Sequence, residues 1–201
     1  MVYGFVHFND EDPDALTALG DVLVPWVDAN FESLSEGYEI AAMTGASLEE
    51  SGVGADTKSD ILGLTVGVDY TAGDLERFAE AMVWDEQEDV FSHFVEFDRE
   101  VLQGEGCFLD QSCERFDAAD SLYAEIALGI EFWSDYQVSL RRIDMSNGQP
   151  AIVHQLVGPN PTEFSVNIIN VHQQYGFSFV YNNDDGQARR VQALWADGEL
   201  L

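Results

Sequence analysis

The chain has 201 residues, of which 46% are hydrophobic and 12% aromatic, so it can fill the core of one domain or of a domain with an extension. Its 38 acidic and 8 basic residues give a net charge of −30. Such a surface repels phosphates, which excludes nucleic acid and anionic membranes as expected partners and leaves a basic protein partner open.

The acidic residues are unevenly distributed. Residues 1–120 carry 29 acidic and 4 basic side chains, a net charge of −25, whereas residues 121–201 carry 9 and 4, a net charge of −5. The amino terminus lacks a basic segment followed by a continuous apolar one, and no stretch of eighteen residues is apolar. We therefore expect a soluble protein with no signal peptide or transmembrane segment in the chain as given.

Residues 1–60 are expected to form an acidic N-terminal extension. Residues 2–8 alternate weakly and favour a short strand. Asp12 followed by proline is typical of a helix start, and leucines at helical spacing predict a helix over 13–30. The following Ser-, Gly- and acid-rich stretch, residues 32–60, reads as a linker with a domain boundary at its end.

Residues 61–201 are expected to form an α+β domain. Residues 64–70 alternate as a strand, and the apolar stripe after them predicts a helix or helix pair. Residues 94–102 return to a strand pattern before a Gly-Glu-Gly turn. Cys107 and Cys113 follow in a short acidic segment, where a disulfide and two free thiols both fit the sequence. A disulfide would indicate export, because such bonds persist in oxidising compartments.

The stretch 124–140 alternates almost without interruption, which places its even-numbered apolar residues on one face of a sheet. At roughly 3.3 Å per residue this run would be about 55 Å long, so it must bend or split, and Trp133–Asp135 is the expected place. Further strands are predicted over 150–157, 164–181 and 188–196. Gly- and Asn-rich turns separate these strands, so we expect an antiparallel meander.

No catalytic motif accompanies these elements. His154 and His172 lie in strands that can be neighbours, but a catalytic or metal role would require them to meet, and single histidines on strands are more often hydrogen-bonded sheet residues. Asp10, Asp12 and Asp14 have the spacing of a calcium loop, yet Ala15 stands where that loop needs glycine. We expect no catalytic residue, no metal and no cofactor, and an enzyme is the least favoured reading.

Half of the basic residues form two pairs, Arg141-Arg142 and Arg189-Arg190. Adjacent residues on a strand point to opposite faces, so one arginine of each pair faces inward. The inward arginine could bind a ligand carboxylate or phosphate, or it could balance acidic side chains across the sheet. Aromatic stripes that include Tyr175, Phe177 and Trp195 could likewise fill a core or line a cavity.

Two passages resemble the START-like, or helix-grip, superfamily of lipid-transfer and polyketide-cyclase-related domains. These are Phe94–Gly106, and Phe132–Arg142 followed by Ala151–Val157; the resemblance covers about residues 61–201. It implies a curved antiparallel sheet meander packed on one or two helices. Members of the superfamily normally end in a long closing helix, which is apparently absent here, so either the chain is truncated or the helix over 13–30 takes that place.

Together these patterns predict non-enzymatic binding of a lipid or other hydrophobic small molecule in a cavity between curved sheet and helix. The alternative is an acidic structural or protein-interaction domain with a filled core and no ligand. The residues expected to contact the ligand are Ile126, Leu128, Ile130, Phe132, Tyr136, Val138, Arg142, His154, Tyr175, Phe177 and Trp195.

Overall fold

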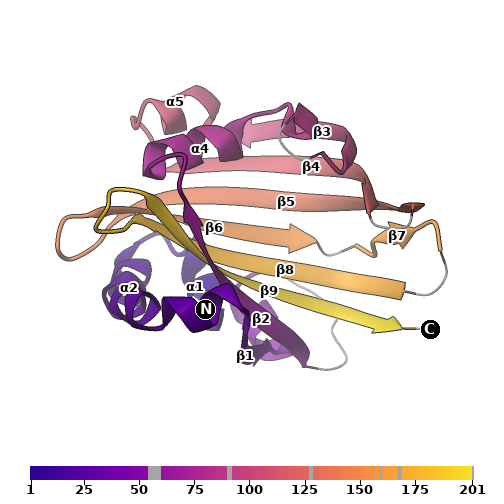
Figure 1. Cartoon of the computed structure of the whole chain (residues 1–201), viewed down its shortest axis with the longest axis horizontal. Coiled ribbons are helices and arrows are strands. Elements are labelled where there is room, and N and C mark those ends of the chain that lie inside the picture. Colours follow the sequence, from indigo (N-terminus) through magenta and orange to yellow (C-terminus); the bar gives the residue numbers. More distant parts are fainter. Residues whose placement is uncertain (54–59, 90–91, 127–128, 159, 167–168, 201) are drawn as a thin grey trace.

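The computed structural model describes residues 1–53, 60–89, 92–126, 129–158, 160–166 and 169–200. Over these residues, nine strands form one antiparallel sheet in the order β1-β2-β9-β8-β6-β5-β4-β3, with β7 beside β5 (Figure 1). The strands are β1 (Tyr38–Met43), β2 (Ile61–Tyr70), β3 (Phe94–Gln103), β4 (Arg115–Ile126), β5 (Ile130–Asp144), β6 (Pro150–Gly158), β7 (Glu163–Phe164), β8 (Ile169–Asn182) and β9 (Ala188–Leu200). The helices are α1 (Val2–Val6), α2 (Asp14–Ser35), α3 (Gly45–Glu50), α4 (Leu75–Val83) and α5 (Glu105–Leu109), with 3-10 turns η1 (His7–Asn9) and η2 (Gln87–Asp89).

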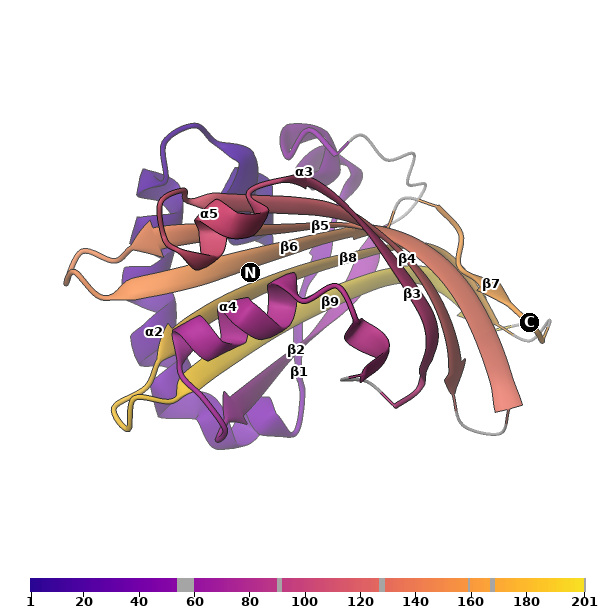
Figure 2. The ribbon, with the colours of Figure 1, turned by 90° about the horizontal axis from the view of Figure 1, so that it is seen from above.

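Helices cover both faces of the sheet. α1 and α2 pack on one face, called here the α2 face, and α4 and α5 pack on the other, called the α4 face (Figures 1 and 2). In β2, β4, β5 and β6, and in residues 173–182 of β8 and 188–197 of β9, the odd-numbered side chains point to the α2 face and the even-numbered ones to the α4 face. β3 and β4 bend around the segment that carries α4 and η2 (Figure 2). This architecture confirms the predicted α+β class with a curved, helix-grip-like antiparallel sheet.

The α2 face holds the main aromatic core. Phe5 meets Tyr175 and Trp195 edge-on, with ring centroids 5.8 and 6.1 Å apart. α2 crosses these strands closely: a Cβ atom at Gly20 would lie 2.6 Å from the ring of Phe179. Helix α2 confirms the helix predicted over 13–30 and extends it to Ser35. It lies on the face opposite α4, and β9 is the last element among the described residues.

The N-terminal segment differs from its prediction in two places. Residues 2–8 were expected as a strand but form α1 and the start of η1, which bury Phe5 and Phe8 at a spacing of three residues. The segment expected as a linker holds β1 and α3; Thr44 caps α3 because its hydroxyl accepts a hydrogen bond from the Ser47 amide. Residues 54–59 of this segment lie outside the described chain. A separable extension over 1–60 stays a prediction, although its helices pack on the same sheet.

The long alternation over 124–140 is two strands, not one bent strand. β4 and β5 pair through Ala124 opposite Phe132 and Ile126 opposite Ile130, with Gly129 at φ 72° between them. The predicted break at Trp133–Asp135 is therefore wrong, because those residues lie inside β5. The alternation did not reveal the hairpin for a geometric reason. Each even-numbered residue of β4 pairs with an even-numbered residue of β5, so the apolar residues are even-numbered on both strands.

Other predicted features are present. The turns between β5 and β6 and between β8 and β9 contain Gly148 and Gly186 at positive φ, as their composition indicated. Cys107 and Cys113 form a disulfide, which settles the choice that the sequence left open. No helix in the described ranges is long and apolar enough to cross a membrane.

Candidate ligand site on the α4 face

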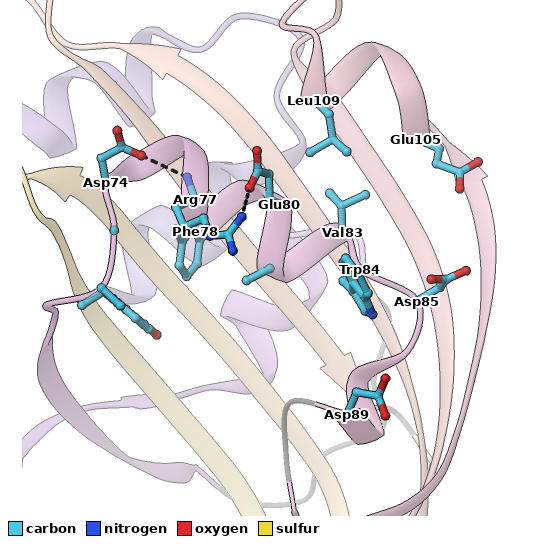
Figure 3. Close-up of a pocket in the computed structure, with 14 residues that line it drawn as sticks. Asp74, Arg77, Phe78, Glu80, Val83, Trp84, Asp85, Asp89, Glu105 and Leu109 are labelled. Carbon is cyan, nitrogen blue, oxygen red and sulfur yellow. Dashed lines mark hydrogen bonds and ion pairs between the residues drawn. The ribbon is translucent and has the colours of Figure 1, made fainter.

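Helix α4 is the element around which the site is built. Asp74 starts the helix, because its carboxylate accepts a hydrogen bond from the Arg77 amide at 3.1 Å. The apolar stripe Leu75, Phe78 and Ala79 is buried against the sheet, as the sequence predicted. The other side of the helix faces outward and forms part of a groove (Figure 3).

The groove has a volume of about 840 Å³, which lies in the range of small-molecule sites. Its apolar wall includes two large side chains that are open to solvent, Trp84 (51% exposed) and Leu109 (39% exposed). The loop from β2 to α4 forms one end and α5 the opposite side (Figure 3). The groove is lined by Tyr70, Ala72, Gly73, Asp74, Arg77, Phe78, Glu80, Ala81, Val83, Trp84, Asp85, Asp89, Glu105 and Leu109.

Arg142 of β5 fixes the two helical walls relative to the sheet. Its guanidinium donates two hydrogen bonds to the Glu76 carboxylate of α4, at 2.9 and 2.7 Å. It also donates to the carbonyl of Phe108 in α5 at 3.2 Å and lies over the Phe108 ring. The disulfide joins Cys107 inside α5 to Cys113 in the segment that follows the helix. Arg142 thus reaches the α4 face, and its partner there is a carboxylate of the protein. Arg141 is also buried, on the opposite face, so the expectation that only one arginine of the pair faces inward is wrong.

A buried ion pair lies beneath the end of α4. Arg99 of β3 donates to both carboxylate oxygens of Asp120 in β4, at 2.7 and 2.6 Å, and the two side chains are only 3% and 5% exposed. The same guanidinium donates to the carbonyls of Met82 and Trp84. These hydrogen bonds satisfy backbone carbonyl groups at the C-terminal end of α4 and hold Trp84 at the groove.

A cluster of polar side chains lies under α4 around Arg190. Its guanidinium donates to the hydroxyls of Ser178 and Tyr70, at 3.0 and 3.3 Å, and lies 3.3 Å from Nδ1 of His154. Burial, with the nearby cations Arg190 and Arg99, holds the pKa of His154 well below its usual range, so the imidazole is neutral. Its Nε2 atom has no hydrogen-bond partner among the described residues. Tyr70 links this cluster to the groove that it lines.

Further along the α4 face, toward β7, polar side chains meet at Gln174. Its amide group donates to the hydroxyls of Ser134, Tyr136 and Thr162, at 3.2, 3.0 and 2.8 Å. Burial raises the pKa of Tyr136, which keeps its hydroxyl protonated. On β2 and β9 the same face exposes a stripe of apolar side chains, which comprises Leu62, Leu64, Val68 and Leu194.

The predicted contact residues divide between the two faces. The α4 face receives Ile130, Phe132, Tyr136, Val138, Arg142 and His154, by the parity of their strands. Tyr175, Phe177 and Trp195 lie on the α2 face, where they are at most 1% exposed in the filled core. Leu128 and the side chain of Ile126 lie outside the described structure. None of the predicted residues lines the groove, so their contact with a ligand stays a prediction.

The two histidines considered together in the sequence do not meet. His154 lies opposite Ser178 in the sheet, six residues from His172 along β8, which is about 20 Å of strand. Glu125 and Glu131 belong to the odd-numbered positions of β4 and β5 and so face away from His154. In the described ranges, no group of three or more His, Cys, Asp or Glu side chains is placed to hold a metal ion.

Sequence reasoning missed the residues that form the groove. Neither Trp84 nor Leu109 is among the residues that the sequence predicted to contact a ligand. Periodicity locates the buried side of α4, and Phe78 and Val83 of that side reach the groove. The other lining residues come from the outward side of the helix, from the segments on either side of it and from α5. The signal available in the sequence was a tryptophan followed directly by a run of carboxylates.

The fold and the site together define a class of α+β protein in which helices cover a curved antiparallel sheet and leave an apolar groove on one face. No family model matches the sequence, and no curated protein matches it.

Among solved structures, the chain is similar to a STAR-related lipid transfer protein from Xanthomonas axonopodis, with a TM-score of 0.44 and 9% sequence identity over 74% of this chain and 82% of that chain. Human STARD10 gives a TM-score of 0.43 and 10% identity over 85% and 67% of the two chains. Ara h 8.0201 gives 0.32 and 12% identity over 66% and 77%. At such TM-scores these structures say nothing of function, which must be inferred from the residues of the α4 face.

Proposed function

We propose that this protein binds a lipid or other hydrophobic small molecule, without catalysis, in the groove between α4 and α5. The observation that carries this proposal is the groove itself: a cavity of about 840 Å³ with Phe78, Val83, Trp84 and Leu109 in its wall. Each methylene group that leaves water for such a wall stabilises the complex by about 0.8 kcal/mol. The hydrogen bonds of Arg99 and Arg142 hold α4 and α5 in place before a ligand arrives, which lowers the ordering cost of binding.

The test is a titration with 1-decanol, a neutral ligand with one alkyl chain, followed by NMR of the tryptophan indole groups. We expect the Trp84 signal to shift, with the assignment made by Trp84→Phe. Replacing Leu109 by Gln removes one apolar wall residue without changing the charge, and we expect about tenfold weaker binding.

Leu102→Gln is the matched control, because Leu102 is also exposed (56%) and does not line the groove. Its affinity for decanol should equal that of the wild type. Equal affinity in the Leu109 variant, or shifts confined to indoles other than Trp84, would contradict the proposed site.

A basic protein partner is the second candidate, and the net charge of −25 over residues 1–120 favours it. In that case a polycationic peptide should bind more weakly as the salt concentration rises. The NMR signal of the Trp84 indole should not shift when the peptide binds. Binding that persists at high salt would argue against a purely electrostatic partner.

We also propose that the protein is exported, since Cys107 and Cys113 are paired and disulfides persist in oxidising compartments. Alkylation of the protein with iodoacetamide directly in its source cells, followed by mass spectrometry, checks this. Addition of two alkyl groups without prior reduction would contradict the proposal.

A further inference from the structure

We infer that the groove on α4 selects hydrophobic organic cations, such as alkylammonium compounds, over neutral or anionic molecules of the same length. This inference rests on the proposed function and adds to it the charge of the ligand. It follows from three carboxylates of the groove that have no partner among the described residues, and from the position of Trp84 beside them.

The charged side chains that line the groove are five carboxylates and one guanidinium. The guanidinium, Arg77, donates to the Glu80 carboxylate at 2.6 Å, so these two charges offset each other. Asp74 is engaged at the start of α4, where it accepts from the Arg77 amide. Both interactions lie at the end of the groove near the β2–α4 loop (Figure 3).

Three carboxylates remain at the other end. Asp85, Asp89 and Glu105 are exposed, and their side chains make no hydrogen bond or ion pair with any other residue in the described ranges. They come from η2, from the segment before it and from α5, and in Figure 3 they lie on the Trp84 side of the groove. Arg99 is the cation beneath this end, and its charge is already matched by Asp120. The electrostatic potential in this part of the groove is therefore negative.

Trp84 gives this end of the groove a second means of holding a cation. Its side chain is 51% exposed, although the backbone carbonyl of the same residue is fixed by Arg99 at 3.0 Å. The face of an indole ring attracts an ammonium group, and Leu109 and Val83 offer hydrocarbon surface beside it. A molecule with a cationic head and an alkyl body can satisfy the carboxylates and the apolar wall together. A carboxylate-headed molecule would be repelled.

The experiment compares n-decylammonium, 1-decanol and decanoate on the wild-type protein, with affinities from calorimetry and the site from the Trp84 indole signal. At low salt we expect decylammonium to bind about tenfold or more tighter than decanol, and decanoate more weakly than decanol. In ~1 M salt, where charges are screened beyond about 3 Å, the preference should largely disappear.

The triple variant Asp85→Asn, Asp89→Asn and Glu105→Gln should bind decylammonium and decanol with similar affinity. The matched control neutralises three exposed carboxylates elsewhere, Glu32→Gln, Glu49→Gln and Glu50→Gln, and should keep the preference. Thermal unfolding of both variants confirms that they are folded. Trp84→Leu, which retains an apolar wall, should weaken decylammonium more than decanol.

The outcomes separate this inference from the proposed function. If decanol shifts the Trp84 signal but decylammonium binds no tighter, the groove binds hydrophobic molecules without charge selection and the inference is overturned. If the preference survives in the triple variant, or is lost equally in the control, the net charge of the whole protein causes it and the inference is again overturned. If no probe reaches Trp84, the proposed function itself fails.

Discussion

The two faces of the sheet are built from the same strands, yet they carry different kinds of side chain. On β8, Tyr175, Phe177 and Phe179 point to the α2 face and are fully buried among other aromatic rings. Between them, Gly176 and Ser178 point to the α4 face, where polar and charged groups lie under a small helix. The α2 face is a filled aromatic core. The α4 face also has an apolar core, which includes Phe108, Phe116 and Leu140, but it combines this core with a buried polar network and an open groove.

The arginine pairs show how this difference is used. Arg141 turns to the α2 face and donates to the carbonyls of Phe8, Asp10 and Glu11, which fixes the N-terminal segment. Its neighbour Arg142 turns to the α4 face and ties α4 and α5 together. Two adjacent residues of one strand therefore anchor the helical layers on opposite sides of the sheet. Both faces are expected to contribute to stability through their buried groups, and only the α4 face is expected to bind a ligand.

The largest expected effect comes from the filled core. Phe177→Ala should lower the free energy of unfolding by about 3–5 kcal/mol, because it removes a fully buried ring from a core that cannot collapse around the gap. Urea denaturation measures this. Leu194→Ala, on the exposed stripe of the α4 face, should change stability by about 0.5 kcal/mol or less. A similar cost for both variants would remove the distinction between the faces.

The buried ion pair beneath α4 is the next test. Asp120→Ala leaves the Arg99 guanidinium buried without its counter-charge and should cost about 3 kcal/mol or more. The comparison variant is Glu80→Ala, which breaks the Arg77–Glu80 pair of the same 2.6 Å length at an exposed site and should cost about 0.5 kcal/mol or less. Replacing both members, Arg99→Met with Asp120→Leu, should restore part of the lost stability. Equal costs for the two single variants would contradict the role given to burial.

The smallest expected effect is a dependence on pH. Because the pKa of His154 in the folded protein lies well below the usual 6.5, the unfolded chain takes up a proton below pH 6.5 that the folded protein does not. The stability that depends on neutral His154 is therefore complete above pH 6.5 and is lost as the pH falls, by up to about 1.4 kcal/mol per pH unit. The free energy of unfolding, measured by urea denaturation at pH values from 7 to 5, should fall less steeply with falling pH in His154→Gln than in the wild type. An equal fall in the two proteins would show that another group causes the pH dependence.

The sequence anticipated much of the fold. The helical stripe at Leu75 and Phe78, the turns at Gly148 and Gly186, and most strand segments after residue 61 are in the structure. Local patterns failed where they were short or ambiguous, as in the first eight residues. The hairpin at Gly129 escaped detection because its pairing preserves the parity of the alternation.

The candidate site was less predictable than the fold. The sequence selected apolar residues of the strands, and the structure buries Phe177 and Trp195 in a filled core while it opens a groove at Trp84 and Leu109. Periodicity shows that a side chain belongs to one face of an element. It does not show whether that face is later covered, since covering depends on a helix from elsewhere in the chain.

By itself, then, the sequence determined the class of fold, the alternation of each strand and the acidic charge that disfavours nucleic acid and anionic membranes. These properties depend on residue order and composition, and they act over a few residues or over the whole surface. Only the tertiary structure decided which face is filled by aromatic rings and which keeps a groove beside its core, and which of many carboxylates lie unpaired beside Trp84. Those outcomes depend on contacts between segments far apart in the chain, such as Arg99 with Asp120 and Arg142 with Glu76, which no local pattern encodes.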